Sequence, residues 1–353
     1  MSELLRTEIA PGYSISRVIK GGWQLAGGHG VVDSRRARQD MRRFVESGLT
    51  TFDCADIYLG VEELIGDFLA WYRPGREGRP EVQVHTKFVP DREALRGLRP
   101  AGVEAAIDRS LRRLGVERLD LVQFHWWDYD VAGYVDVGQW LDRLRAAGKI
   151  RHLGVTNFDQ PRLGQLLAAG VRIVSHQVQY SIVDRRPEEG MVDLCQEHGI
   201  LLLCYGSALG GLLATQYRHQ AEPRAPFANR SLTKYMLIAE EFGGWALFQE
   251  LLEVLAGVAE KHGVDPTSVA TRWVLDRPGV AAAIVGARDA SHLEANRGLL
   301  RLRLDEEDRA RIDAVAARRK GPRGDTYGLE RVKDGRHASI MKYDLNAARA
   351  RAR

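Results

Sequence analysis

The chain has 353 residues, of which 44% are hydrophobic and 28% charged, with a formal net charge of +4. This is the composition of an ordinary globular protein, and the absence of an apolar run near the roughly 20 residues that span a bilayer argues against a membrane protein. The start MSELLRTEIA is too charged for a secretory signal, and three scattered cysteines do not fit a disulfide framework or structural zinc, so we expect a soluble cytoplasmic protein.

Short β-branched runs alternate with amphipathic segments of helical length along most of the chain. These candidate strands are residues 17–20, 49–53, 82–87, 119–125, 150–155, 172–177, 200–205 and 281–285. Between the third and fourth, residues 103–114 repeat apolar side chains at intervals of three and four, and Gly115 is expected to end that helix. About eight strands alternating with helices predict an α/β fold, the (β/α)8 or TIM barrel.

The second half of the chain departs from this rhythm. Residues 210–245 are polar and contain two prolines, which predicts a large loop. Helices are expected at 245–262 and at 266–276, the second begun by Asp265 as N-cap with Pro266 in the first turn, and further helices at 290–300 and 305–318. A Rossmann fold is the competing architecture, but the glycines between residues 21 and 30 do not fit a GxGxxG turn between a strand and a helix.

The end of the chain carries the positive charge. Residues 318–353 contain eleven Lys or Arg against four Asp or Glu, so the rest of the chain is slightly acidic. No aromatic platform or binding motif accompanies the basic residues, and we expect no nucleic-acid partner. The predicted organisation is a barrel domain over residues 1–320, with an N-terminal hairpin and extra helices, followed by a long basic C-terminal tail over residues 321–353.

Four polar residues fall at or just beyond the carboxyl ends of consecutive predicted strands: Asp53, Tyr58, Lys87 and His125. Active sites of (β/α)8 barrels are built at that face, so these side chains are expected to meet. Tyrosine is a weak acid, with a pKa of about 10, and Lys87 is the neighbouring cation that would favour its phenolate. Asp53 would hold the lysine charged, and His125 would hydrogen-bond a substrate carbonyl rather than bind a metal. Asp53 and Lys87 could alternatively form a purely structural ion pair.

The segments around these residues resemble a known family. TFDCADIYLGVEELIG, VHTKF and LDLVQFHW are similar to the active-site segments of the aldo-keto reductase superfamily, and the resemblance covers nearly the whole chain. It implies carbonyl reduction by a nicotinamide cofactor, with Tyr58 as the proton donor. The chain has Cys54, Leu59 and Val61 where the family usually has Thr, Gly and Ser, and none of these departures removes a catalytic group.

The resemblance also implies a cofactor site. GVTNFD, SHQVQYS, LLLCYGSALGGLL and IVGARDASHLEANR resemble its cofactor-binding segments. Besides Asp53, the implied residues are, from the nicotinamide end to the adenosine end, Gly22, Trp23, Thr156, Asn157, Gln177, Tyr205, Gly206, Ser207, Leu209, Gly211, Gly286, Ala287, Arg288, His292 and Asn296. Gly286 and His292 replace basic residues of well-known members, but Arg288 is a good phosphate ligand, so NADP(H) is favoured over NAD(H).

The substrate end is expected to be partly aromatic. Trp23, Trp126 and Trp127 would surround the carbonyl beside Tyr58 and His125, although one of the two adjacent tryptophans could instead face the barrel wall. In the superfamily the long loop and the tail often close over the substrate, which makes residues of the tail further candidates: Tyr327, Arg331, Met341 and Tyr343.

Two functions are compatible with these residues. The first is an NADP(H)-dependent oxidoreductase acting on a small carbonyl substrate, or in reverse on an alcohol or sugar. The second is a regulatory, redox-sensing NADP(H)-binding subunit resembling the potassium-channel β subunits. An unrelated barrel hydrolase is a weaker third reading. No metal site is expected, and both a monomer and an oligomer are compatible with the sequence.

Overall fold

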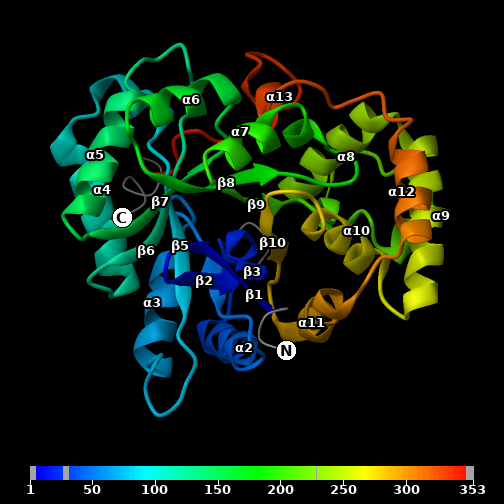
Figure 1. Cartoon of the computed structure of the whole chain (residues 1–353), viewed down its shortest axis with the longest axis horizontal. Helices are drawn as coiled ribbons and strands as arrows, with labels where there is room; N and C mark the ends of the chain where they lie inside the picture. Colours follow the sequence, from blue (N-terminus) through cyan, green and yellow to red (C-terminus); the bar gives the residue numbers. More distant parts are fainter. Residues whose placement is uncertain (1–4, 27–31, 228, 347–353) are drawn as a thin grey trace.

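The computed structural model describes residues 5–26, 32–227 and 229–346. Eight parallel strands close into a barrel in the order β10-β3-β4-β5-β6-β7-β8-β9, shown at the centre of Figure 1. They are β3 (Val18–Gly21), β4 (Thr51–Asp53), β5 (Gln83–Phe88), β6 (Leu119–Phe124), β7 (Ile150–Thr156), β8 (Ile173–Gln179), β9 (Leu201–Tyr205) and β10 (Val280–Gly286). Each overlaps one of the eight predicted runs, so the TIM barrel is confirmed. Gly27, Gly28 and Gly30, which entered the Rossmann comparison, lie outside the described residues.

An N-terminal hairpin closes one end of the barrel. Its strands β1 (Arg6–Ala10) and β2 (Tyr13–Ser16) pair antiparallel. Ile9, Tyr13 and Ile15 are buried in a separate apolar cluster with side chains of the barrel strands, among them Leu121 and Leu203. The functional site must therefore lie at the opposite end, where the carboxyl ends of the strands meet.

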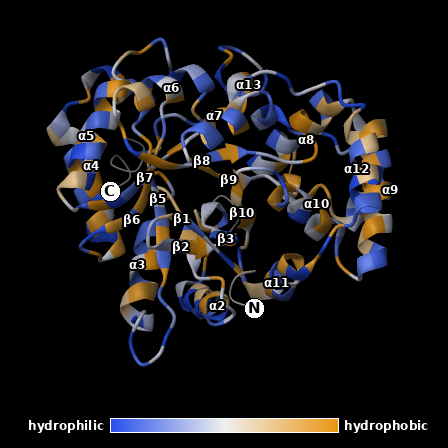
Figure 2. Ribbon diagram, viewed as in Figure 1, coloured by the Kyte–Doolittle hydropathy of each residue, from blue (hydrophilic) through white to orange (hydrophobic). Residues whose placement is uncertain are grey.

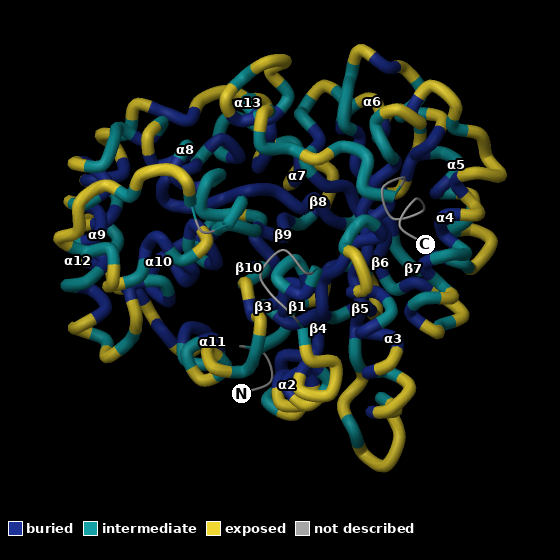
Figure 3. The backbone as a smooth tube through the Cα atoms, turned by 180° about the vertical axis from the view of Figure 1, so that it is seen from behind, coloured by how far each residue is buried: buried dark blue, intermediate teal, exposed yellow. Residues whose placement is uncertain are grey.

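Helices surround the barrel. The surrounding ring consists of α2 (Ser34–Glu46), α3 (Val61–Tyr72), α4 (Pro100–Leu114), α5 (Tyr134–Ala146), α6 (Gln160–Ala168), α7 (Met191–Glu197) and α10 (Pro266–Leu275), followed after β10 by α11 (Leu293–Arg301). α9 (Trp245–His262) and α12 (Glu306–Ala316) pack outside this ring, at the right of Figure 1. Apolar residues concentrate on the strands and the inward helix faces (Figure 2), and the same parts are buried (Figure 3).

The stretch predicted as one large loop contains regular structure. It holds the short helices η4 (Leu209–Gly211) and η5 (Thr215–Tyr217), and then the 13-residue helix α8 (Arg230–Phe242). The side chain of Asn229 caps α8 by accepting a hydrogen bond from the Leu232 amide. Tyr235, Met236 and Ala239 recur at intervals of one to four residues on its buried face. The loop prediction was therefore wrong for the second half of this stretch.

The described part of the tail, through residue 346, lies over the barrel mouth. It runs from α12 past α13 (Gly328–Arg331) and η7 (Ala338–Ile340) and ends beside β5, where the Asn346 side chain donates to the Val89 carbonyl at 3.1 Å. Its basic side chains pair with carboxylates of the body: Arg323 with Glu189, Lys333 with Asp130 and Arg336 with Glu240. Much of the tail's charge is thus matched within the chain.

A helix that crosses a bilayer needs about 20 predominantly apolar residues. No single helix among the described residues is long and apolar enough to cross a membrane. α8 and α9 meet the criterion of length and composition as a pair bent by 98°. Their apolar side chains, including Ile238, Phe248 and Leu251, are buried in the core, which accounts for their hydropathy.

Candidate active site

A cavity of about 1130 Å³ opens at the carboxyl ends of the strands. Its wall includes Asp53, Tyr58, Lys87 and His125, so the barrel brings together four residues from the ends of three strands and the loops that follow them. From there it extends past Tyr205 and the loop after β9 to Arg288 and Asn296, beyond the end of β10. An elongated cavity with polar groups at both ends suits an extended ligand.

The charged centre of the site is a buried ion pair. Lys87 Nζ lies 2.5 Å from Asp53 Oδ2 and donates a second hydrogen bond to the Cys54 carbonyl at 2.9 Å. The other carboxylate oxygen, Oδ1, accepts from the side-chain amides of Gln123 and Gln177, at 2.8 and 2.7 Å. Burial by itself lowers the pKa of Lys87, but the adjacent Asp53 outweighs it and holds that pKa above the usual lysine value. The ammonium therefore stays charged.

Tyr58 lies against this pair, in the loop between β4 and α3. Lys87 Nζ is 5.0 Å from the centre of the Tyr58 ring, and the Trp23 ring meets the same ring edge-on at 5.1 Å. Burial raises the pKa of Tyr58 above the usual tyrosine value, while the charge of Lys87 and its hydrogen bond to the phenol oppose this rise. Tyr58 is accordingly a neutral phenol at physiological pH, which can give a proton.

His125 follows β6 and faces the same cavity. Its Nδ1 is 3.0 Å from the Thr156 carbonyl, which can only accept, so Nδ1 carries the proton. Nε2 is buried without a hydrogen-bond partner among the described residues. Burial, together with the charge of Arg331, lowers the pKa of His125 to about 3, so the neutral ring presents Nε2 as an acceptor. The expectation that His125 donates to a carbonyl oxygen therefore does not fit this geometry.

Three residues predicted to contact a nicotinamide lie in the same cavity. Thr156 ends β7, Asn157 follows it and Tyr205 ends β9, and all three line the cavity. Tyr205 donates its hydroxyl proton to Asn157 Oδ1 at 2.9 Å, which leaves the Asn157 amide group as a donor. Gln177 also lines the cavity, but its Nε2 is engaged by Asp53 and Gln123.

The loop after β9 forms the middle of the cavity wall. Gly206, Ser207 and Gly211, which the resemblance assigns to cofactor binding, line it. Gly206 has a φ of +78°, and a Cβ there would stand 2.8 Å from the Tyr235 hydroxyl, so glycine is required. The Ser207 hydroxyl contacts the Thr271 hydroxyl of α10 at 3.0 Å, which joins the loop to the helix behind it.

The far end of the cavity follows β10. Gly286, Arg288, His292 and Asn296, which the sequence analysis assigns to an adenosine end, line it. The Asn296 amide nitrogen is buried without a hydrogen-bond partner among the described residues. A buried donor of this kind is suited to an acceptor on a ligand such as an adenine ring.

Four predicted site residues lie behind the cavity wall. The Gly22 amide donates to the Asp53 carbonyl at 2.7 Å, so this glycine lets β3 approach Asp53 closely. Leu209 is fully buried with its amide given to the Gly206 carbonyl, and Ala287 is fully buried with its carbonyl held by Lys20. Trp126 is fully buried and donates to the Asp128 and Val131 carbonyls, so the predicted substrate contact was wrong for Trp126.

Trp127 is the tryptophan that reaches the cavity. Its ring meets the His125 ring edge-on at 4.4 Å. Of the four tail candidates, Tyr327 and Met341 line the cavity. Arg331 lies behind Tyr327 and donates to the Trp126 carbonyl at 2.8 Å, and Tyr343 packs against Trp127.

Two further residues of the site were not predicted from the sequence: Gln123, which binds Asp53, and Lys234, which lines the cavity. Gln123 lies two residues before His125 on the same strand, and this period-two spacing places both side chains on the inner face of the barrel. Lys234 comes from α8, the helix that was predicted as loop, and lines the cavity beside Tyr205. No cluster of three or more metal-ligating side chains occurs among the described residues.

Comparison with known proteins defines the class of this fold and site. The sequence profile of the Aldo/keto reductase family matches residues 17–317. The chain therefore belongs to the aldo/keto reductase family, and with it to the oxidoreductases that use a nicotinamide cofactor, as the sequence motifs predicted.

Particular relatives are similar over much of the chain. Flagellar radial spoke protein 5 of Chlamydomonas reinhardtii is 33% identical over 258 residues, which cover 63% of this chain and about half, 49%, of that protein. Aldo-keto reductase YhdN of Bacillus subtilis is 27% identical over 310 residues, covering 86% of this chain and 91% of the relative. The solved glycerol dehydrogenase AKR11B4 of Gluconobacter oxydans superposes with a TM-score of 0.76 at 25% identity, over 90% of this chain and 97% of the dehydrogenase.

Proposed function

We propose that the protein is an NADP(H)-dependent reductase of aldehydes or ketones, with Tyr58 as general acid. The observation that carries this proposal is the contact of a neutral phenol with a buried, permanently charged lysine in the wall of an elongated cavity. When bound, NADPH supplies hydride to the carbonyl carbon. The three free cysteines are all buried and unpaired, which is in keeping with work in a reducing cytoplasm.

The residues divide the work of proton transfer. Tyr58 gives its proton to the carbonyl oxygen as negative charge develops there, and the Lys87 ammonium stabilises the resulting phenolate. Asp53 keeps Lys87 charged and in place, with Gln123 and Gln177 holding the carboxylate. Nε2 of His125 accepts a hydrogen bond from the hydroxyl of the alcohol that forms, and thereby orients the reacting oxygen.

The residues along the cavity fit an extended dinucleotide. Asn157 Nδ2 would meet the carboxamide, and the ring of Tyr205 would stack on the nicotinamide. Gly206, Ser207 and Gly211 line the middle of the cavity, where the pyrophosphate would lie, and Asn296 supplies a donor that lacks a partner among the described residues. The direct test is the loss of NADPH absorbance at 340 nm with a panel of aldehydes and ketones. NADPH binding without turnover of any carbonyl would favour the regulatory alternative instead.

The preference for NADP(H) is assigned to Arg288, which lines the adenosine end. Replacing Arg288 by alanine is expected to raise Kd for NADPH about tenfold or more, because a charge-assisted hydrogen bond to the 2′-phosphate is lost. Kd for NADH, which lacks that phosphate, should change less than twofold. Arg297→Ala is the matched control, since Arg297 lies on α11 nearby and pairs with Glu294. Equal losses for both cofactors would contradict the assignment.

The pH dependence follows from the shifted groups. Reduction needs the protonated phenol, and because the pKa of Tyr58 is raised, kcat for reduction should stay level up to at least about pH 10, the usual tyrosine value, and fall above it. Oxidation of the alcohol needs the phenolate, so kcat for oxidation should rise with pH until Tyr58 is deprotonated. With a pKa of about 3, His125 contributes no step between pH 5 and 8. A reduction profile that falls with a midpoint near pH 7 would contradict these roles.

A further inference from the structure

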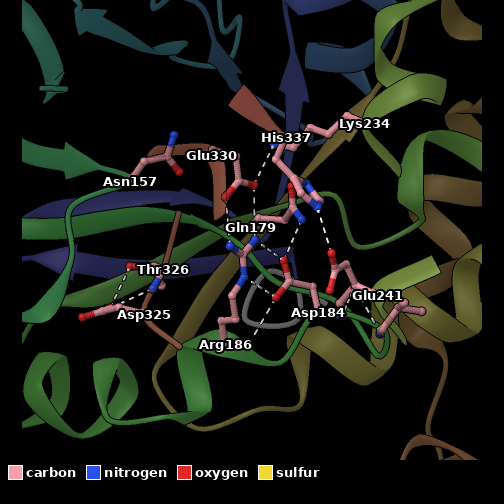
Figure 4. A network of polar contacts seen from close by, with 12 residues as sticks. Asn157, Gln179, Asp184, Arg186, Lys234, Glu241, Asp325, Thr326, Glu330 and His337 are labelled. Atoms are coloured by element: carbon pink, nitrogen blue, oxygen red, sulfur yellow. Dashed lines mark hydrogen bonds and ion pairs between the residues drawn. The ribbon is translucent and has the colours of Figure 1, made fainter. Parts of the chain in front are cut away.

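A buried charged cluster joins the tail to the nicotinamide end of the cavity. Arg186, which follows β8, pairs with Asp184 at 2.7 Å and with Glu330 of the tail at 2.9 Å, and all three side chains are at most 1% exposed. Figure 4 shows Arg186 between the two carboxylates, with Gln179 also bound to Asp184. Burial by itself would raise the pKa of Glu330, but Arg186 and Lys234 lower it to about 2, so Glu330 is charged.

Lys234 connects this cluster to the cavity wall. Its Nζ is 4.0 Å from Glu330 Oε1 and 3.5 Å from the Tyr205 hydroxyl oxygen, and it lies over the Tyr205 ring at 4.9 Å. Among the described residues, Glu330 is the only one whose carboxylate lies within 4.0 Å of the Lys234 ammonium. Its removal would therefore leave the Lys234 charge, which is 15% exposed, without a close counter-ion.

The hydrogen bonds along this path have a fixed direction. An ammonium can only donate, so the Tyr205 oxygen accepts from Lys234 and its single proton goes to Asn157 Oδ1. Asn157 is thereby held with its carbonyl oxygen toward Tyr205 and its two amide protons available to the cavity. Without Lys234 in place, the Tyr205 hydroxyl could turn and the Asn157 amide could rotate.

The tail also holds the backbone next to Asn157. Thr326 donates its hydroxyl to the Phe158 carbonyl at 2.6 Å, and Asp325 accepts from the Gln160 amide at 2.8 Å. Asn157 has a φ of +60°, a left-handed conformation that asparagine adopts more readily than most residues other than glycine. The same segment of tail thus reaches the surroundings of Asn157 by two routes, through Lys234 and Tyr205 and through the backbone that follows Asn157.

We propose that Glu330, acting through Lys234 and Tyr205, is a positioning residue that orients the Asn157 amide for the nicotinamide carboxamide. The proposal rests on the function proposed above, because it needs a nicotinamide at Asn157. It makes the tail part of the cofactor site as well as a cover for the substrate.

The test compares two ligands by isothermal titration calorimetry. NADPH reaches Asn157, whereas adenosine 2′,5′-bisphosphate carries the adenosine half alone. Glu330→Gln is expected to raise Kd for NADPH about tenfold, the size of one well-made hydrogen bond, and to leave Kd for the bisphosphate within about twofold. Glu240→Gln is the matched control, because it removes one charge of the exposed ion pair between Glu240 of α8 and Arg336 of the tail. This variant should change neither Kd.

A second variant guards against a general loss of structure. Lys234→Met leaves the Arg186–Glu330 pair intact and should produce the same selective loss, whereas Lys234→Arg, which keeps a donor, should retain most of the affinity. The double variant of Glu330→Gln and Lys234→Met should lose no more than either change alone, since both act through one path. Equal losses for the two ligands, or additive losses in the double variant, would overturn the proposal. If the wild-type protein binds NADPH but reduces no carbonyl, the proposed enzymatic function is refuted. The comparison of the two Kd values would still decide whether Glu330 positions Asn157.

Discussion

Replacing Tyr58 by phenylalanine is expected to lower kcat for carbonyl reduction by about two to four orders of magnitude, the usual contribution of a positioned general acid. The ring remains, so its edge contact with Trp23 and its contact with Lys87 persist, and the fold should be unaffected. Kd for NADPH should change less than about twofold, because the lost hydroxyl serves the substrate. Stopped-flow measurement of hydride transfer separates this chemical step from product release.

The control is the same chemical change elsewhere. Tyr72→Phe removes a hydroxyl at the end of α3 that has no hydrogen-bond partner among the described residues, and it should leave kcat as it is. If Tyr58→Phe retained more than about a tenth of the wild-type kcat, another group would have to supply the proton. His125 could not readily do so, since its pKa of about 3 leaves it unprotonated.

Replacing Lys87 by methionine should affect stability as well as catalysis. Asp53 and Lys87 are 5% and 6% exposed, and removing one member of a buried pair leaves the other charge uncompensated, at a cost of about 3–5 kcal/mol in the free energy of unfolding. The phenolate of Tyr58 would also lose its stabilising cation, so kcat should fall by about a hundredfold or more. Urea denaturation and steady-state kinetics measure the two effects separately.

A double variant distinguishes the two roles of the pair. Adding Asp53→Asn to Lys87→Met removes the stranded charge while keeping an oxygen that can accept from Gln123 and Gln177, so part of the lost stability should return. Activity should not return, because the cation is still missing. Lys149→Met, which breaks a partly exposed ion pair with Asp108, should cost about 1 kcal/mol or less. A similarly small loss for Lys87→Met would show that the buried pair is not needed for folding.

The barrel was predictable because its strands are buried on both faces and therefore read as β-branched runs. The convergence of these polar side chains on one cavity was predictable for a related reason, since parallel strands bring their carboxyl ends to one edge whatever the details of the helices. The positions of Asp53, Lys87 and His125 in the cavity followed once the end of each strand had been located in the sequence. α8 was missed because two prolines and polar residues dominate the window, although the caps and apolar positions of the helix itself are present.

Other parts of the site depend on contacts that no local pattern reports. Trp126 and Trp127 are adjacent in a turn where the strand period has ended, so which ring enters the cavity is decided by the carbonyls of Asp128 and Val131 that bind Trp126. The position of Lys234 depends on where α8 packs, and that of Glu330 on a pairing across 144 residues with Arg186. Such long-range contacts follow from the assembled fold.

The hairpin covers one end of the barrel, so the cavity opens at the other end, where the carboxyl ends of the strands meet. Ile9, Tyr13 and Ile15 of the hairpin are buried against the barrel strands, and the Tyr13 hydroxyl lies 3.1 Å from Nε2 of His85, which is buried inside the barrel. On the proposed function, cofactor and carbonyl compound would enter through the mouth at the carboxyl ends of the strands, which Tyr327 and Met341 of the tail help to line. The tail therefore lies where a ligand of this cavity enters and leaves.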